Sequence, residues 1–227
     1  MKRALVLVLA VFATIIFSVP VMAIGLGGSF TAGVAKAYWT DLETEGSGTA
    51  AFYGGSFIFD TAVAKNSLFN YRANFAIQAI DADTESDSVE EGDKLKYKTE
   101  GMRYALFNSF GFGVVRTSSV RFWLGPQFGL HYQDADTTET ASRLWNVTYV
   151  GTTPVPLYRD VKTKTDDNGV GFSLGLVLGL NINIGPVFTL GLDGGCRGFF
   201  TATSEVANAG PEGFVNVSLI FRISDTY

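Results

Sequence analysis

The most constraining feature of this sequence is an alternation of apolar and polar residues that recurs along the chain and is clearest at its end. In residues 213–227, GFVNVSLIFRISDTY, apolar side chains occupy every second position from Val215 to Ile223. Polar side chains such as Asn216 and Arg222 lie between them, and Ile220 is the one exception. A period of two residues places the two sets on opposite faces of an extended strand. One face of each such strand must therefore be buried or turned toward lipid.

The same alternation predicts eight strands, and the connections between them alternate between long and short. Outer-membrane barrels have short turns on one side and long loops on the other, whereas a Greek-key sandwich gives no reason for such alternation. We therefore predict an all-β fold, an eight-stranded antiparallel transmembrane up-and-down β-barrel. Pro126 cannot donate to the ladder, so we expect a bulge in the strand that contains it. The predicted strands are 24–34, 51–60, 69–78, 99–115, 120–132, 169–180, 188–197 and 213–227.

The polar face is rich in glycine and serine, and the apolar face carries large Leu, Phe and Val side chains. A narrow barrel interior needs small residues, so the polar face is expected inside and the apolar face toward lipid. A soluble lipocalin-like barrel is the alternative, but it would reverse the faces and leave five mid-strand arginines on the surface. No stretch after Ala23 is long and apolar enough for a transmembrane helix.

The first residues predict a secretory signal peptide. Lys2 and Arg3 precede an apolar run from Ala4 to Phe17, and Val21-Met22-Ala23 is a small-residue cleavage pattern. We therefore expect a signal peptide at 1–23 and a barrel domain at 24–227. The whole chain has 17 basic and 22 acidic residues; without Lys2 and Arg3 there are 15 basic residues and the net charge is −7. That balance argues against nucleic acid as a partner, and the single Cys196 excludes an internal disulfide or a cysteine-based metal site.

The signal peptide, the eight alternating strands, the unequal connections and the terminal aromatic Tyr227 together resemble the small outer-membrane barrels of the OmpA, OmpX and OmpW kind. No diagnostic motif of one subfamily can be matched. The resemblance implies a location in the cell outer membrane of a Gram-negative bacterium. It also implies outer-membrane lipid, lipopolysaccharide and the barrel-insertion machinery as partners, and through OmpW it implies transport of small hydrophobic compounds.

The inward face is predicted to carry five arginines but only two acids. In a narrow lumen these charges must pair or keep water. The first interpretation is a structural plug, because side chains normally fill eight-stranded barrels. The second is a narrow pore, in which an excess of arginine favours anions. The residues of this predicted lumen network are Arg72, Arg103, Arg121, Arg197, Arg222, Asp60, Asp193 and His131.

The predicted outside is acidic, because the long connections 35–49, 81–98, 133–168 and 201–212 together carry a net charge of −10. Residues 81–93 hold seven acids, and the simplest interpretation is a solvated loop. Asp83, Asp87 and Glu91 have ligand chemistry suited to calcium, but their spacing matches no EF-hand loop, so we predict no metal site.

Catalysis is not expected, and no cofactor is predicted. His131 is the only histidine, and no Ser or acid beside it in the sequence suggests a triad. The sequence thus favours a surface scaffold that displays acidic loops around a polar, arginine-rich lumen. A transporter of small hydrophobic compounds and a loop-based adhesin remain as alternatives, and the surface ligand is not identified.

Overall fold

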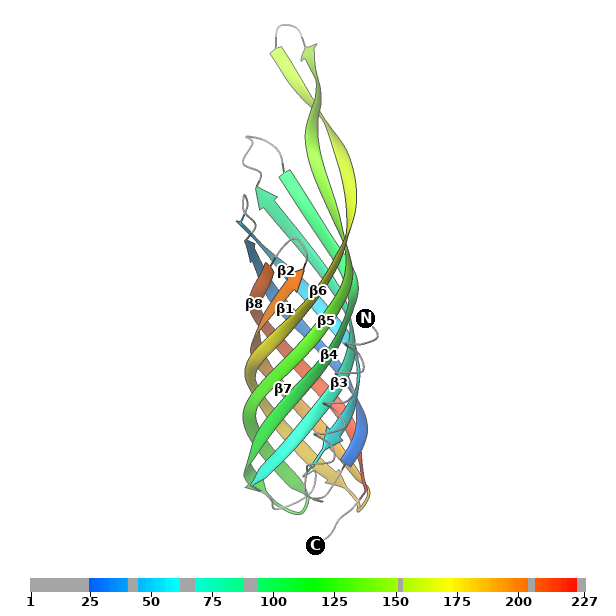
Figure 1. The fold of residues 1–227 in the computed structure, drawn as a ribbon, viewed down its shortest axis with the longest axis vertical. Coiled ribbons are helices and arrows are strands. Elements are labelled where there is room, and N and C mark those ends of the chain that lie inside the picture. Colours follow the sequence, from blue (N-terminus) through cyan, green and yellow to red (C-terminus); the bar gives the residue numbers. More distant parts are fainter. Residues whose placement is uncertain are drawn as a thin grey trace.

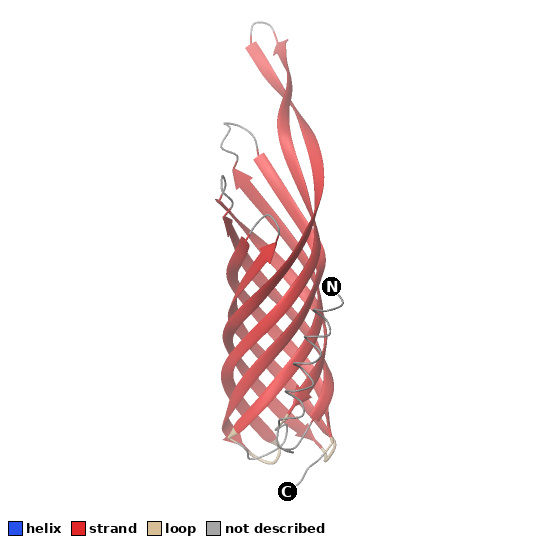
Figure 2. Ribbon diagram, viewed as in Figure 1, coloured by secondary structure: helices blue, strands red, loops and turns tan. Residues whose placement is uncertain are grey.

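The computed structural model describes residues 25–40, 45–61, 68–87, 94–150, 153–203 and 207–223 (Figure 1). The expected signal peptide lies outside these residues. All the regular elements among the described residues are strands (Figure 2). The described residues contain no helix long and apolar enough to cross a membrane. The strands are β1 Gly25–Thr40, β2 Glu45–Asp60, β3 Phe69–Asp87, β4 Lys94–Arg116, β5 Val120–Val150, β6 Thr153–Ile184, β7 Phe188–Thr203 and β8 Ala207–Arg222.

The eight strands form one closed antiparallel barrel in chain order, as the alternation predicts. Each strand pairs with the next, and β1 closes the barrel by pairing with β8 from Gly25↔Arg222 to Thr40↔Ala207. Closure satisfies backbone groups that an open sheet would leave at its edges, which a membrane interior cannot tolerate. The predicted fold class is therefore confirmed.

Large apolar side chains cover the outside of the barrel. On β6 the outward series from Val170 to Leu178 is more than half exposed at most positions, whereas the inward Ser173 and Val177 are buried. Ile220, the exception in the last strand, lies inside and packs against Ile58. The inner face also carries many glycines; a Cβ added to Gly179 would lie 2.1 Å from the Trp123 ring, so glycine is required for this ring to fit.

The strands extend much farther at one end of the barrel than the sequence predicts. In the expected long connection 133–168 the sequence suggests strand extensions only at 143–149 and 154–158. Most of this connection is strand, because β5 has 31 residues and β6 has 32. The block of acids after residue 80 is also largely strand, since β3 continues to Asp87. Its register places Asp83 opposite Lys98 and Glu85 opposite Lys96. Cross-strand pairs of opposite charge stabilise a sheet, which explains why polar sequence is extended here rather than looped.

The predicted bulge at Pro126 is wrong. The register of β4 against β5 skips Gly125 and Pro126 but is unchanged on either side of them. The shift instead falls between Gly113 and Val115, close to the short turn where β4 passes into β5. Pro126 removes one donor from the ladder without inserting a residue, so the strand continues straight through it.

Candidate functional site in the barrel interior

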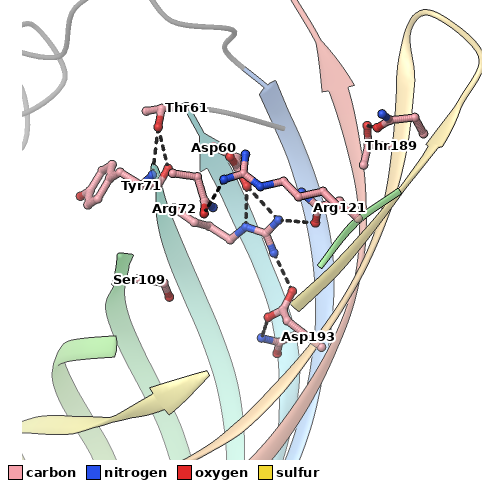
Figure 3. Close-up of polar contacts among 12 residues, drawn as sticks. Asp60, Thr61, Tyr71, Arg72, Ser109, Arg121, Thr189 and Asp193 are labelled. Carbon is pink, nitrogen blue, oxygen red and sulfur yellow. Dashed lines mark hydrogen bonds and ion pairs between the residues drawn. The ribbon is translucent and has the colours of Figure 1, made fainter. Parts of the chain in front are cut away.

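Arg72 is the centre of a buried ion network (Figure 3) at the end of the barrel where β1 begins, because its partner Asp60 pairs with Gly25. Its Nε donates to Asp60 Oδ2 at 2.8 Å, Nη1 donates to Asp193 Oδ1 at 2.6 Å, and Nη2 donates to Asn181 Oδ1 at 3.0 Å. Asn216 Nδ2 donates to the other oxygen of Asp193 at 2.6 Å. The side chain of Arg72 is 1% exposed, so its positive charge meets the two carboxylates away from solvent.

The strand register explains one of the two ion pairs of Arg72. Asp60 and Arg72 are direct cross-strand partners on β2 and β3, so their pairing is local. Asp193 comes from β7 on the opposite wall and is reached across the lumen. The guanidinium also lies 5.0 Å from the centre of the Trp123 ring, which favours a cation over its face.

A second buried network is built on Glu212, which belongs to the predicted outer connection 201–212. Glu212 is 1% exposed and accepts hydrogen bonds from two arginines. Arg103 Nη1 lies 2.6 Å from Glu212 Oε2, and Arg197 Nε lies 2.5 Å from Glu212 Oε1. Gln78 Oε1 accepts from Arg103, and Gln127 Oε1 accepts from Arg197, each at 2.9 Å. One carboxylate therefore holds two strands' arginines together.

The assignment of Glu212 to a loop is wrong because β8 begins at Ala207, well before the clear alternation at Val215. Glu212 shares the inward parity of Asn216, Ser218 and Arg222, and this is the signal that could have found it. Its neighbours Pro211 and Gly213 are poor strand formers, which hides the start of the strand.

Aromatic rings surround the Glu212 network. The guanidinium carbon of Arg197 lies 3.7 Å from the ring centre of Phe107 and 4.5 Å from that of Phe214. Arg103 lies 4.5 Å from the ring centre of Phe52. These inward-facing rings occupy space between the charged groups, so the interior at this level combines ion pairs with apolar packing.

The other three predicted lumen residues make further contacts. Arg121 donates to Asn70 Oδ1 at 3.3 Å, and Arg222 donates to the backbone oxygens of Gly185 and Phe188 beside the β6–β7 turn. His131 Nε2 is 2.8 Å from Thr201 Oγ1. The structure therefore gathers Arg72, Asp60 and Asp193 in one cluster, with Arg121 beside Arg72 and Asp60 (Figure 3), and Arg103 and Arg197 in another, close enough to His131 for their charges to act on it. Arg222 lies at the β6–β7 turn.

The described lumen network has five arginines against three carboxylates, which leaves a surplus of two positive charges when His131 is neutral. Among the residues that the structure describes, no group of three or more His, Cys, Asp and Glu side chains could hold a metal ion. Asp83, one of the acids considered for calcium, lies on β3 opposite Lys98, and Glu91 lies outside the described residues.

The chain has the architecture of the small eight-stranded outer-membrane β-barrels, as the resemblance implies. It matches no family model and no curated protein. Among solved structures it is similar to the attachment invasion locus protein Ail of Yersinia pestis, at 12% identity over 89% of this chain and 99% of that one, with a TM-score of 0.32.

Two further structures show the same distant likeness. Neisserial surface protein A is 12% identical over 86% of this chain and 97% of that one, with a TM-score of 0.31. The outer membrane protease OmpT of Escherichia coli is 9% identical over 88% of this chain and 97% of that one, with a TM-score of 0.25. Similarity this low does not transfer a function to this chain.

Proposed function

We propose that this chain is a non-catalytic outer-membrane β-barrel that acts as an anchor with a plugged lumen and presents the β5–β6 hairpin outside the membrane. The apolar outer face supports the membrane location, because a water-soluble protein rarely exposes so large an apolar surface. Outer-membrane lipid and lipopolysaccharide would contact this face, and the barrel-insertion machinery would place it there. Outward residues that are at least half exposed include Phe30, Val34, Tyr53, Phe57, Ile77, Phe110, Leu130, Phe172, Leu174, Leu176, Val215, Val217 and Leu219.

The observation that carries the plug is the pairing of buried charge across the lumen. Arg72 joins carboxylates from β2 and β7, and Glu212 joins arginines from β4 and β7. Opening a water path would separate these pairs in a poorly hydrated space, at a cost of several kcal/mol for each unpaired ion. The interior therefore favours a closed barrel over a transporter of hydrophobic compounds.

One observation favours a second candidate, a narrow anion path. The described network keeps a surplus of two arginines over its carboxylates. If the side chains rearranged to admit water, that surplus would attract anions. This candidate uses the same residues as the plug and differs from it only in whether the lumen conducts.

Planar-bilayer recording of the refolded chain under a salt gradient separates the two candidates. We expect no reproducible conductance from protein whose insertion is demonstrated by heat-modifiable migration on a gel. Small channels with an anion-selective reversal potential would contradict the plug and favour the anion path. Channels that prefer a small cation would contradict both.

A deletion tests the role proposed for the hairpin. Removal of residues 142–160 takes away only strand that pairs within the hairpin, because the β4–β5 register ends at Leu95↔Ala141 and the β6–β7 register ends at Gly169↔Thr203. We expect the shortened chain to fold into a barrel. Cells that carry it are expected to lose the ligand binding that the parent chain confers on the cell surface. Surface binding that survives the deletion would contradict the role of the hairpin.

A further inference from the structure

The short turn between β4 and β5 places two arginines next to each other at one end of the lumen. Arg116 is the last residue of β4, Arg121 is the second residue of β5, and the two are direct partners in the register. Thr117 closes the turn between them. Its Oγ1 donates to the backbone oxygen of Val120 and accepts from the backbone N–H of Val120, each at 2.9 Å. The hydrogen-bonded turn therefore holds the backbones of the two arginines side by side.

A β-bulge directs the side chain of Arg116 into the lumen. Even-numbered residues of β4 face outward up to Val114, which is 59% exposed. The register shift between Gly113 and Val115 inserts one residue, so Val115 also faces outward, at 46% exposed. The next residue, Arg116, returns to the inner face. A Cβ added to Gly113 would lie 2.8 Å from Arg116 Cδ and 3.4 Å from Arg121 Nε, so both arginine side chains lie over this glycine.

A buried amide borders the two arginines. Asn70 is 4% exposed, and its Oδ1 accepts a hydrogen bond from Arg121 Nη2 at 3.3 Å. The Nδ2 of the same amide is buried and has no hydrogen-bond partner among the residues that the structure describes. Buried donors in folded proteins are nearly always paired. This amide beside Arg121 therefore requires an acceptor that the described part of the chain does not supply.

Positive charge exceeds negative charge at this end of the lumen. Arg116 adds a sixth arginine to the five of the predicted network, and both carboxylates at this end bind Arg72. Arg121 is close enough to Asp60, Arg72 and Arg116 for their charges to act on it. Like charges in opposite positions destabilise a sheet, so an anion between Arg116 and Arg121 would stabilise this end of the barrel. The charged residues described here are Arg72, Arg116, Arg121 and Arg222 against Asp60 and Asp193.

We propose that Arg116, Arg121 and the Nδ2 of Asn70 form a binding site for a phosphate group. Arg116 is exposed and meets the ligand at the mouth of the barrel, whereas Arg121 is 1% exposed and holds it inside. A planar guanidinium donates to two oxygens of a phosphate at once, and the amide N–H donates to a third. The surplus of positive charge matches the one or two negative charges of such a group.

The location of the site restricts the source of the phosphate. Short turns of outer-membrane barrels face the periplasm, and the β4–β5 turn is one of the short turns. The ligand is therefore a soluble phosphate compound of the periplasm or the headgroup of a phospholipid in the facing leaflet. Binding at this mouth goes beyond the anchoring role and does not require the lumen to conduct.

Calorimetric titration tests the site and separates the two sources. The refolded chain is kept in micelles of a nonionic detergent at constant ionic strength. Inorganic phosphate and short-chain phosphatidylglycerol are titrated separately, and we expect saturable binding of one phosphate group per chain. Saturation by inorganic phosphate identifies a soluble ligand, whereas saturation by phosphatidylglycerol alone identifies a headgroup. Heat-modifiable migration of the same sample shows that the barrel is folded.

Matched arginine substitutions locate the contact. Arg116→Gln should weaken binding by at least about tenfold, because it removes a charge-assisted contact with the ligand. The exposed position of Arg116 at the mouth should let this variant fold. The control is Arg159→Gln, which removes another exposed arginine on the β5–β6 hairpin and should bind phosphate as the parent does.

Asn70→Asp tests the site without removing an arginine. The aspartate has nearly the same shape as the asparagine and keeps an acceptor for Arg121, but it replaces the Nδ2 donor with negative charge. We expect the folded variant to lose phosphate binding, because the new carboxylate takes the place of the ligand's charge.

Four outcomes would overturn the inference. These are a folded parent chain without saturable binding, an equal loss in Arg159→Gln, an unchanged affinity in Asn70→Asp, and chloride bound as tightly as phosphate. In each case a barrel that is folded and does not conduct leaves the proposed function standing. A chain that fails to insert, or that conducts, would contradict the proposed function itself.

Discussion

The barrel interior and the stalk of the β5–β6 hairpin, which we define as residues 133–143 and 159–168, contain ion pairs with the same N–O distance in opposite environments. Arg72 Nη2 lies 2.8 Å from Asp60 Oδ2, and Lys164 Nζ lies 2.8 Å from Asp136 Oδ2. The first pair is 1% and 0% exposed, and the second is 64% and 49% exposed. Distance alone therefore does not rank their importance. Burial makes the loss of one buried partner costly, whereas water replaces the partner of an exposed charge.

The largest difference is expected for Glu212→Gln. The change leaves Arg103 and Arg197 buried without their shared carboxylate and should lower the free energy of unfolding by about 3–5 kcal/mol. Urea unfolding in detergent micelles measures it. The control Glu100→Gln removes an exposed partner of Lys98 and should leave the unfolding midpoint unchanged. Equal effects of the two changes would contradict the comparison.

Arg72→Lys tests the geometry of the Arg72 network rather than its charge. A lysine keeps the charge but cannot match the planar fork that serves Asp60, Asp193 and Asn181. We expect a loss of about 2 kcal/mol, the contribution of one hydrogen bond to a charged group. Arg159→Lys, on the exposed stalk, is the control in the same unfolding assay. An unchanged midpoint in Arg72→Lys would show that charge alone suffices.

Gly179→Ala tests packing against Trp123, the ring beside Arg72, without changing any charge. The new methyl group would overlap the Trp123 ring, so we expect a destabilisation of about 1–3 kcal/mol and a change in near-ultraviolet circular dichroism. Gly198→Ala is the matched control, because the nearest atom to its new Cβ is 4.0 Å away. A stable Gly179→Ala barrel would mean that the interior yields more easily than its packing suggests.

The smallest effect is expected for the stalk pair. The hydrogen bond from Lys164 lowers the pKa of Asp136, so the pair stabilises the stalk above the ordinary pKa of aspartate and loses that contribution as pH falls through the lowered value. A carbon NMR titration should show the lowered pKa of Asp136 return toward its ordinary value in Lys164→Gln. Lys162→Gln, one position along the same face, should leave the titration unchanged.

The sequence predicts which side chains point into the barrel better than it predicts which of them meet across the lumen. Alternation assigned Arg72 and Arg103 to the inner face because parity within a strand is a local property. The partner of Arg72 across the lumen, Asp193, depends on how the strands are staggered around the barrel, and no local pattern encodes that stagger. Within the long connection the sequence suggests strand extensions only at 143–149 and 154–158. Around Thr137, Thr138 and Thr140 no apolar period marks a strand, although threonine favours one.

The pairing of β1 with β8 also has a kinetic consequence. Gly25 meets Arg222, so this seam joins the two ends of the described chain. Contacts of such high sequence separation require the entropy of loop closure before they return any energy, and folding slows as their share rises. An unclosed sheet would meanwhile present two unpaired edges to lipid. Assembly is therefore expected to be slow and to be completed in a single cooperative closing step.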